Sequence, residues 1–211
     1  MRINLNLDAK ELLKYIDRPY DEAEVSELIS EIKPSLGYKV LPANITDFMV
    51  KLCGYDIKSH YLAKGLENST KAIFMWATLG KELDDKIHAL LSEDKIYKAT
   101  LLDELASFAV DFLIEKLYLR LKQDYIKKRK FLTLRYSPGY GDIALDESEN
   151  LIKLDDTCTI SYNGAMLLPQ KSITAIVGIS STPELRNYPK GTGLCRGENC
   201  YACKTWACMK S

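Results

Sequence analysis

The amino-acid sequence predicts an α+β protein built on an antiparallel β-sheet flanked by helices. The stretch from Lys81 to Ser137 contains neither glycine nor proline, and its apolar residues recur at helical spacing. This pattern predicts one long helix over about 94–127. Short runs rich in β-branched and aromatic residues, such as KAIFMWATL at 71–79, predict strands. Because helical and strand-like segments do not alternate regularly, a parallel α/β sheet is disfavoured.

The other elements follow from capping residues and from clusters of β-branched residues. Asp8 is placed to cap a first helix, with Glu11 three residues later, and either Ser92 or Asp94 is placed to start the long helix. The predicted helices besides the long one are 8–18, 21–33, 59–67, 81–91 and 146–154. The predicted strands are one or two within 36–53, then 71–79, 131–135, 157–162 and 173–179. A proline and glycine pair at 138–139 predicts a type II turn after the strand at 131–135.

Composition predicts one globular domain with a small appendage. The 211 residues are 46% hydrophobic, which suits a single core, so we expect a domain at 1–190 and a cysteine-rich tail at 191–211. Lys plus Arg and Asp plus Glu both number 29, so bulk charge gives no reason to expect nucleic-acid binding. No apolar run approaches the roughly 18 residues of a membrane span. The first residues lack the apolar stretch of a signal peptide, so we expect a cytoplasmic protein.

The tail carries the spacing Cys-x4-Cys-x2-Cys-x4-Cys, formed by Cys195, Cys200, Cys203 and Cys208. Without a secretion signal, four clustered thiols favour metal binding over disulfides. The first three repeat the spacing of plant-type ferredoxins, but the fourth lies nearer. An iron–sulfur cluster, a structural zinc ion and unmetallated thiols all remain open. The chain has only two histidines, which disfavours a histidine-rich catalytic zinc site.

The most informative segment is RYSPGYGD, from Arg135 to Asp142. An arginine at a strand end can hold a carboxylate with two parallel hydrogen bonds. Gly139 lets the backbone approach a ligand closely, and Tyr140 can stack on a flat ring. These features suit a small ligand with a carboxylate and an aromatic base. On chemistry alone, the alternative is a hairpin turn with a surface arginine.

The spacing Arg-x-x-x-Gly-Tyr resembles the motif of the activation domain of cobalamin-dependent methionine synthase. The likeness continues through DESENLIKLDD at 146–156 and TISYNGAMLLPQKSITAIVGI at 159–179, where an extra leucine separates Met166 from Pro169. Upstream, ATLGKELDDKI and ELASFAVDFLIEKL are similar to the free-standing branch of the family. The resemblance covers roughly residues 70–180. The cysteine-rich tail is a departure from the conventional domain.

The resemblance implies that the chain binds S-adenosylmethionine. Arg135 would contact the ligand's carboxylate, and the turn with Gly139, Tyr140 and Asp142 would hold the nucleoside. Asp111 is the best-aligned acidic residue of the long helix, although an edge residue facing water is the plainer interpretation. Asp94 is a weaker candidate, because it suits a helix start.

The resemblance implies that the chain is a component of methionine synthase, a methyltransferase of methionine biosynthesis. It would support reductive methylation of Co(II) cobalamin with no catalytic acid or base, because orientation dominates such a transfer. The cobalamin-binding signature Asp-x-His-x-x-Gly is missing. The cobalamin would therefore sit on a partner methionine synthase or another corrinoid protein, and a flavodoxin or ferredoxin would donate the electron. The alternatives are a non-catalytic metal-binding accessory protein of a corrinoid methyltransferase system and a small redox protein.

Overall fold

The computed structural model describes residues 2–3, 7–16, 20–30 and 32–182, so the cysteine-rich tail lies outside the described residues. Its centre is an antiparallel sheet of seven strands in the order β4-β3-β2-β5-β9-β6, with β1 also paired to β2. The strands of this sheet are β1 (Arg2–Ile3), β2 (Ser35–Thr46), β3 (Met49–Leu52), β4 (Tyr55–Lys58), β5 (Ser69–Thr78), β6 (Phe131–Leu132) and β9 (Ser172–Ser180). A separate hairpin pairs β7 (Ser161–Tyr162) with β8 (Leu167–Leu168).

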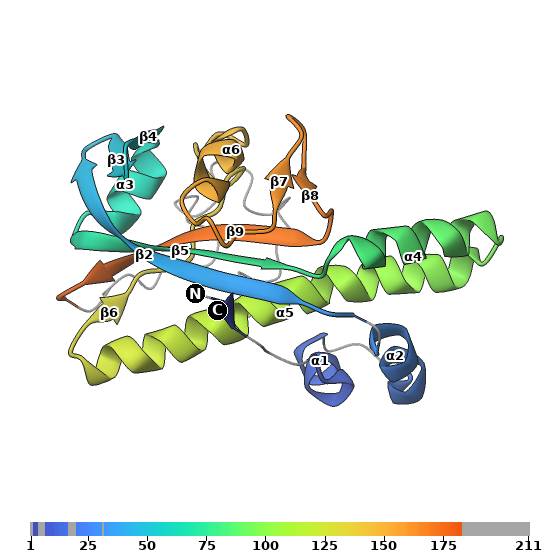
Figure 1. Ribbon diagram of the computed structural model, residues 1–211. Helices are drawn as coiled ribbons and strands as arrows, with labels where there is room; N and C mark the ends of the chain where they lie inside the picture. The colour runs from blue at the N-terminus through green and yellow to red at the C-terminus, as the bar shows by residue number, and fades with distance from the viewer. Residues whose placement is uncertain (1, 4–6, 17–19, 31, 183–211) are drawn as a thin grey trace.

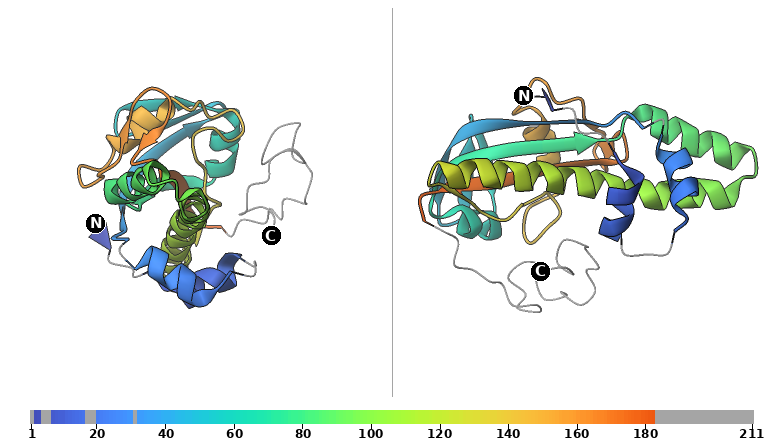
Figure 2. Two further views of the ribbon diagram at one scale, coloured as in Figure 1. Left: turned by 90° about the vertical axis from the view of Figure 1, so that its right-hand side faces the viewer. Right: turned by 90° about the horizontal axis from the view of Figure 1, so that it is seen from below.

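Helices cover both faces of the sheet (Figure 1). They are α1 (Ala9–Ile16), α2 (Glu22–Ile29), α3 (His60–Leu66), α4 (Lys81–Ser92), α5 (Ile96–Lys127) and α6 (Glu147–Ile152). The α+β class and the long helix predicted from the sequence are therefore confirmed. Helix α5 has 32 residues, which makes it about 48 Å long at 1.5 Å per residue. It runs under the sheet, and with α4 it projects beyond the sheet as a helical hairpin (Figures 1 and 2). Among the described helices, none is both long and apolar enough to span a membrane.

The sheet separates two apolar cores. On one face, α5 packs with α1 and α2 against strand residues such as Met75 and Val177. On the other face, α3 and the segment around α6 pack against residues such as Phe74 and Ile176. Strands β5 and β9 are buried on both faces, which explains their nearly continuous apolar sequences.

Three local predictions need correction. The long helix does not start at Ser92 or Asp94 as predicted. Ser92 ends α4, Asp94 has a φ of 56° in the turn between the helices, and α5 starts after Lys95 without a side-chain cap. The strand predicted at 131–135 is shorter, because β6 ends at Leu132. The strand predicted at 157–162 is reduced to β7, since Asp155 accepts hydrogen bonds from the backbone N–H and the hydroxyl of Thr157 and forms a turn there. The predicted cap of the first helix is confirmed, because Asp8 accepts from the N–H of Glu11 at 2.9 Å. The second helix has a similar cap that was not predicted, in which Asp21 accepts from the N–H of Glu24 at 2.8 Å.

Candidate functional site

An extra residue in the edge segment after β6 determines where Arg135 points. Leu132 pairs with Ile179 and Tyr136 pairs with Ile176, so the three residues 133–135 lie opposite only two residues of β9. This is the geometry of a β-bulge, which reverses the alternation of side chains beyond it. As a result, Tyr136 packs in the core on the α3 side of the sheet, whereas Arg135 contacts α5 on the opposite side.

Arg135 forms ion pairs with two carboxylates from consecutive turns of α5. Its Nη2 lies 3.3 Å from Asp111 Oδ1 and 3.1 Å from Glu115 Oε2. Residues four apart on a helix share a face, so both acids reach the same nitrogen. The side chains of Arg135, Asp111 and Glu115 are 13%, 22% and 29% exposed, so the cluster is half-buried and its charges are only partly screened by solvent.

One guanidinium faces two carboxylates in this cluster, and Lys122 adds a second positive charge that acts on Glu115. Burial is the largest cause and raises the pKa of Glu115, while Arg135 lowers it, Asp111 raises it and Lys122 lowers it. The net result is a pKa above the ordinary value for a glutamate. Burial in this half-buried cluster therefore favours the protonated form of Glu115.

The turn after Arg135 has the predicted type II form. The N–H of Tyr140 donates to the carbonyl of Ser137 at 3.2 Å, and Gly139 has a φ of 85°, the conformation that favours glycine at this position. The N–H of Gly139 also donates to the carbonyl of Ile143 at 2.9 Å, which closes the loop. Tyr140 is 37% exposed, so this loop presents an aromatic side chain at the surface.

Helix α3 anchors the end of the same turn. Asp142 accepts hydrogen bonds from the Ser59 hydroxyl and from the N–H groups of His60 at 2.8 Å and Tyr61 at 3.1 Å. Burial raises the pKa of Asp142, but these hydrogen bonds outweigh it and lower the pKa overall. Gly141 has a φ of 60°, and a Cβ placed on it would lie 2.6 Å from the Tyr61 ring. The turn is therefore fixed to α3 by close contact as well as by hydrogen bonds.

The residues predicted from the sequence do not all meet. Asp111 and Arg135 are in contact, and Gly139 and Tyr140 follow Arg135 on the same segment. Asp142 is engaged with the start of α3. Asp94 lies in the turn at the far tip of the helical hairpin (Figure 1), about 25 Å from Asp111 along α5 at 1.5 Å per residue.

Glu115 is the site residue that the sequence interpretation missed. Its position four residues after Asp111 is the signal that points to it, because the two share a helix face. The tail cysteines lie outside the described residues. Within the described ranges, no three or more His, Cys, Asp or Glu side chains are grouped to hold a metal ion.

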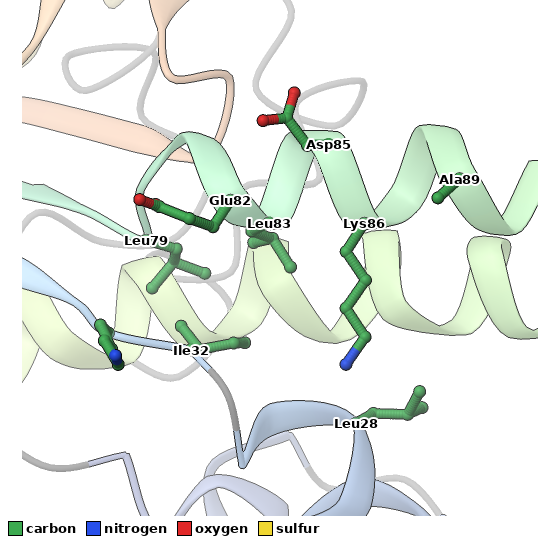
Figure 3. Close-up of a pocket in the computed structure, with 9 residues that line it drawn as sticks. Leu28, Ile32, Leu79, Glu82, Leu83, Asp85, Lys86 and Ala89 are labelled. Atoms are coloured by element: carbon green, nitrogen blue, oxygen red, sulfur yellow. The ribbon is translucent and has the colours of Figure 1, made fainter.

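A pocket of about 470 Å³ lies elsewhere, between the end of α2 and the start of α4 (Figure 3). Its lining is largely apolar, with Leu28, Ile32, Leu79 and Leu83 beside charged groups that include Lys86. None of the site residues predicted from the sequence lines this pocket.

The fold, an antiparallel sheet combined with a long helix, is similar to that of a solved structure. The similar structure is titled "Crystal Structure of the MetH Reactivation Domain bound to AdoHcy", and it superposes with a TM-score of 0.60. The match covers 85% of this chain and 67% of that one, at 14% sequence identity. At this identity the likeness establishes the fold alone. No protein-family model and no curated protein matches the sequence.

Proposed function

We propose that this chain binds S-adenosylmethionine at Arg135 and the Gly139–Tyr140 turn, and acts as a reactivation protein. The observation that carries the proposal is the ion-pair cluster, in which one half-buried guanidinium faces Asp111 and Glu115. The sequence motif and the fold shared with a reactivation domain bound to AdoHcy support it.

The charges of the cluster match the amino-acid end of the ligand. Both ionic contacts of Arg135 involve Nη2, and a guanidinium has five N–H donors, so it retains capacity to bind a carboxylate. Asp111 and Glu115 supply negative charge for the ligand's ammonium group. The turn is joined to Arg135 through Tyr136, whose backbone pairs with Ile176. Anchored on α3, it would hold the nucleoside through backbone groups and the ring of Tyr140.

In the proposed activity, the methyl group of S-adenosylmethionine passes to Co(II) cobalamin on a partner methionine synthase. The transfer consumes one electron from an external donor such as a flavodoxin or ferredoxin, and S-adenosylhomocysteine leaves. This chain binds and orients the methyl donor; orientation alone accounts for large rate effects in such transfers. Arg135, Asp111 and the turn hold the donor in place, and Asp142 positions the turn.

Isothermal titration calorimetry with S-adenosylmethionine tests the proposal. The wild-type chain is expected to bind, and Arg135→Ala to lose at least about ten-fold in affinity, as expected when a charge-assisted bidentate contact is removed. Arg120→Ala is the control, because Arg120 is an exposed arginine on α5, the helix that carries Asp111 and Glu115. Absence of wild-type binding, or equal affinities of Arg135→Ala and Arg120→Ala, would contradict the proposal.

The cysteine spacing of the tail supports a second proposal, that the tail binds a metal ion or cluster. Four thiolates at this spacing suit tetrahedral zinc or an iron–sulfur cluster. A metal ion or iron–sulfur cluster in the tail would make the chain a redox or metal-binding accessory protein of a corrinoid methyltransferase system. Metal analysis with an anaerobic visible spectrum separates these outcomes, because zinc is colourless. Protein that contains neither metal after anaerobic purification and reconstitution refutes metal binding.

A further inference from the structure

We infer that the C-terminal segment, residues 183–211, which includes the cysteine-rich tail, docks on the outer face of α5 near the end of this helix. The outer face is the solvent-exposed side of α5 that carries Leu119 and Ile126. The observation that points to this docking is an uncovered apolar stripe that runs to the place where the C-terminal segment leaves the fold. The inference goes beyond the proposed function and does not depend on ligand binding.

The stripe consists of three apolar residues of α5 at a spacing of seven, Phe112, Leu119 and Ile126, which therefore lie along one face of the helix. The first member is covered, because Phe112 is 8% exposed and belongs to the core to which α1 and α2 contribute. Leu119 and Ile126 are 47% and 49% exposed. Figures 1 and 2 show that α1 and α2 lie against the earlier part of α5, and that none of the described elements covers the outer face near its C-terminal end.

The C-terminal segment leaves the fold beside the uncovered end of the stripe. Ser180, the last residue of β9, pairs with Phe131 shortly after α5. The ammonium group of Lys130 donates to the hydroxyl of Ser181 at 2.9 Å. In Figure 1, β9 and α5 end on the same side of the molecule. The segment therefore begins close to the helix turn that carries Ile126.

The length and the composition of the segment suit this surface. An extended chain from Thr182 to Cys195 spans about 43 Å, whereas the helix from Lys127 back to Leu119 is about 12 Å long at 1.5 Å per residue. Because a tethered segment has a high effective concentration at a nearby surface, it is favoured over a separate partner as the occupant. The segment also carries large apolar and aromatic residues that could cover the stripe, namely Leu185, Tyr188, Leu194, Tyr201, Trp206 and Met209.

Docking at this place would bring the segment to the edge of the candidate site. Leu119 lies four residues after Glu115, so the two residues share a face of α5. Glu115 in turn pairs with Arg135 at 3.1 Å. A segment that covers Leu119 would therefore border the ion-pair cluster and form a wall on that side of the site. Its four cysteines would then lie within reach of the cluster.

Site-specific photo-cross-linking of the full chain tests the inference. The photoreactive residue p-benzoylphenylalanine replaces Leu119 or Ile126 in one pair of variants. In the control pair it replaces Leu91 or Ile96, which are 46% and 64% exposed and lie beside the turn at the tip of the helical hairpin. Mass spectrometry is expected to find links to residues 183–211 from the first pair and not from the control pair. A mixture of isotopically heavy and light protein shows whether each link stays within one chain.

A double variant tests the apolar contact itself. Leu119→Gln with Ile126→Gln removes the apolar side chains and keeps good helix formers on α5. Tryptic cleavage after Arg186 is expected to become about ten-fold faster than in the wild type, because cleavage follows the population of the undocked segment. The matched control, Leu91→Gln with Ile96→Gln, is expected to leave this rate unchanged.

Each experiment has an outcome that overturns the inference. Links from positions 119 and 126 that join two copies of the chain, or that miss residues 183–211, would show that something else or nothing covers the stripe. Equal cleavage rates in the two double variants would show that the apolar residues of the outer face do not hold the segment. Calorimetry with S-adenosylmethionine is a separate measurement, so failure of this inference is distinguishable from failure of the proposed function.

Discussion

Gly141 offers the sharpest test of how the turn is held against α3. Its φ is 60°, and an added Cβ would lie 2.6 Å from both Cγ and Cδ1 of Tyr61 and 3.0 Å from its Cβ. These atoms are at the root of the side chain, so rotation of the ring does not remove the clash. Gly141→Ala is therefore expected to displace the turn from the helix.

The magnitude follows from two costs. A non-glycine residue in the left-handed conformation costs roughly 1–2 kcal/mol, and overpacking a close contact costs about 1–3 kcal/mol. Gly54→Ala isolates the first cost, because Gly54 has a φ of 92° with nothing within 4 Å of the added Cβ. The free energy of unfolding is thus expected to fall by about 1–3 kcal/mol more for Gly141→Ala than for Gly54→Ala.

Urea denaturation followed by circular dichroism measures the difference, with both variants compared at equal m-values. Calorimetry with S-adenosylmethionine would show whether the displaced turn also weakens the ligand. Equal unfolding free energies for the two variants would refute the claim that Gly141 is needed for contact with Tyr61.

Three further predictions concern single side chains. Asp142→Ala is expected to lower the free energy of unfolding by about 1–2 kcal/mol, because the N–H groups at the start of α3 lose their acceptor. The pKa of Asp142 is lowered in the folded protein. The stabilisation by Asp142 is therefore present above the unfolded pKa and is lost as pH falls through the folded pKa. The pKa of Glu115 is raised, so its effect on stability has the opposite pH dependence. Its contribution to the free energy of unfolding is full below the unfolded pKa and is lost as pH rises through the folded pKa. Glu115→Gln is therefore expected to flatten this part of the profile of stability against pH. Trp76→Phe removes the 3.1 Å hydrogen bond from the indole to the buried Asp155 and is expected to cost about 1–3 kcal/mol.

Urea titrations over a series of pH values measure all three. A stability profile of Asp142→Ala that parallels the wild type through the acidic range would refute the assigned capping role. An unchanged slope in Glu115→Gln would show that burial does not perturb this carboxyl group. For Trp76→Phe, a loss no larger than that expected for the smaller ring would indicate that Asp155 finds another donor.

Much of the fold follows directly from residue patterns. The apolar runs at 71–79 and 173–179 are buried on both faces of the sheet in β5 and β9, and long apolar runs of β-branched residues are the signature of such strands. The apolar residues at helical spacing predict a long helix over about 94–127, and α5 ends at Lys127. These elements are predictable because burial and local propensity agree in them.

The start of α5 and the end of β6 were not predictable by the same reasoning. Asp94 has the composition of a cap, yet it occupies a left-handed turn and no side chain caps the helix. The residues 131–135 alternate in sequence, but Thr133 departs from the regular ladder: its carbonyl accepts from the Tyr118 hydroxyl and its own hydroxyl accepts from the N–H of Gly178. Tertiary contacts therefore override the local pattern at the end of β6. At the start of α5 the turn is instead closed by local backbone hydrogen bonds from Asp94 to Leu91 and from Lys95 to Leu90.

The candidate site is predicted in part. The motif locates Arg135 and the turn, and the type II geometry follows from the proline and glycine order. The role of Asp142 in holding α3 was not visible, because the residues it contacts lie about eighty positions away in sequence: its bonds to His60 and Tyr61 span 82 and 81 residues. The pairing of Glu115 with Arg135 likewise depends on the bulge.

Residues 133–135 lie opposite only two residues of β9, and this bulge decides on which face of the sheet Arg135 lies. Regular one-to-one pairing continued from Leu132 and Ile179 would place Arg135, in place of Tyr136, opposite Ile176. The guanidinium would then lie among the apolar side chains near α3, on the face of the sheet opposite α5. A sheet paired in this regular register would keep its layers, but Arg135 would lose its ion pairs with Asp111 and Glu115 on α5. The ion pairs on this surface thus depend on one β-bulge at the edge of the sheet.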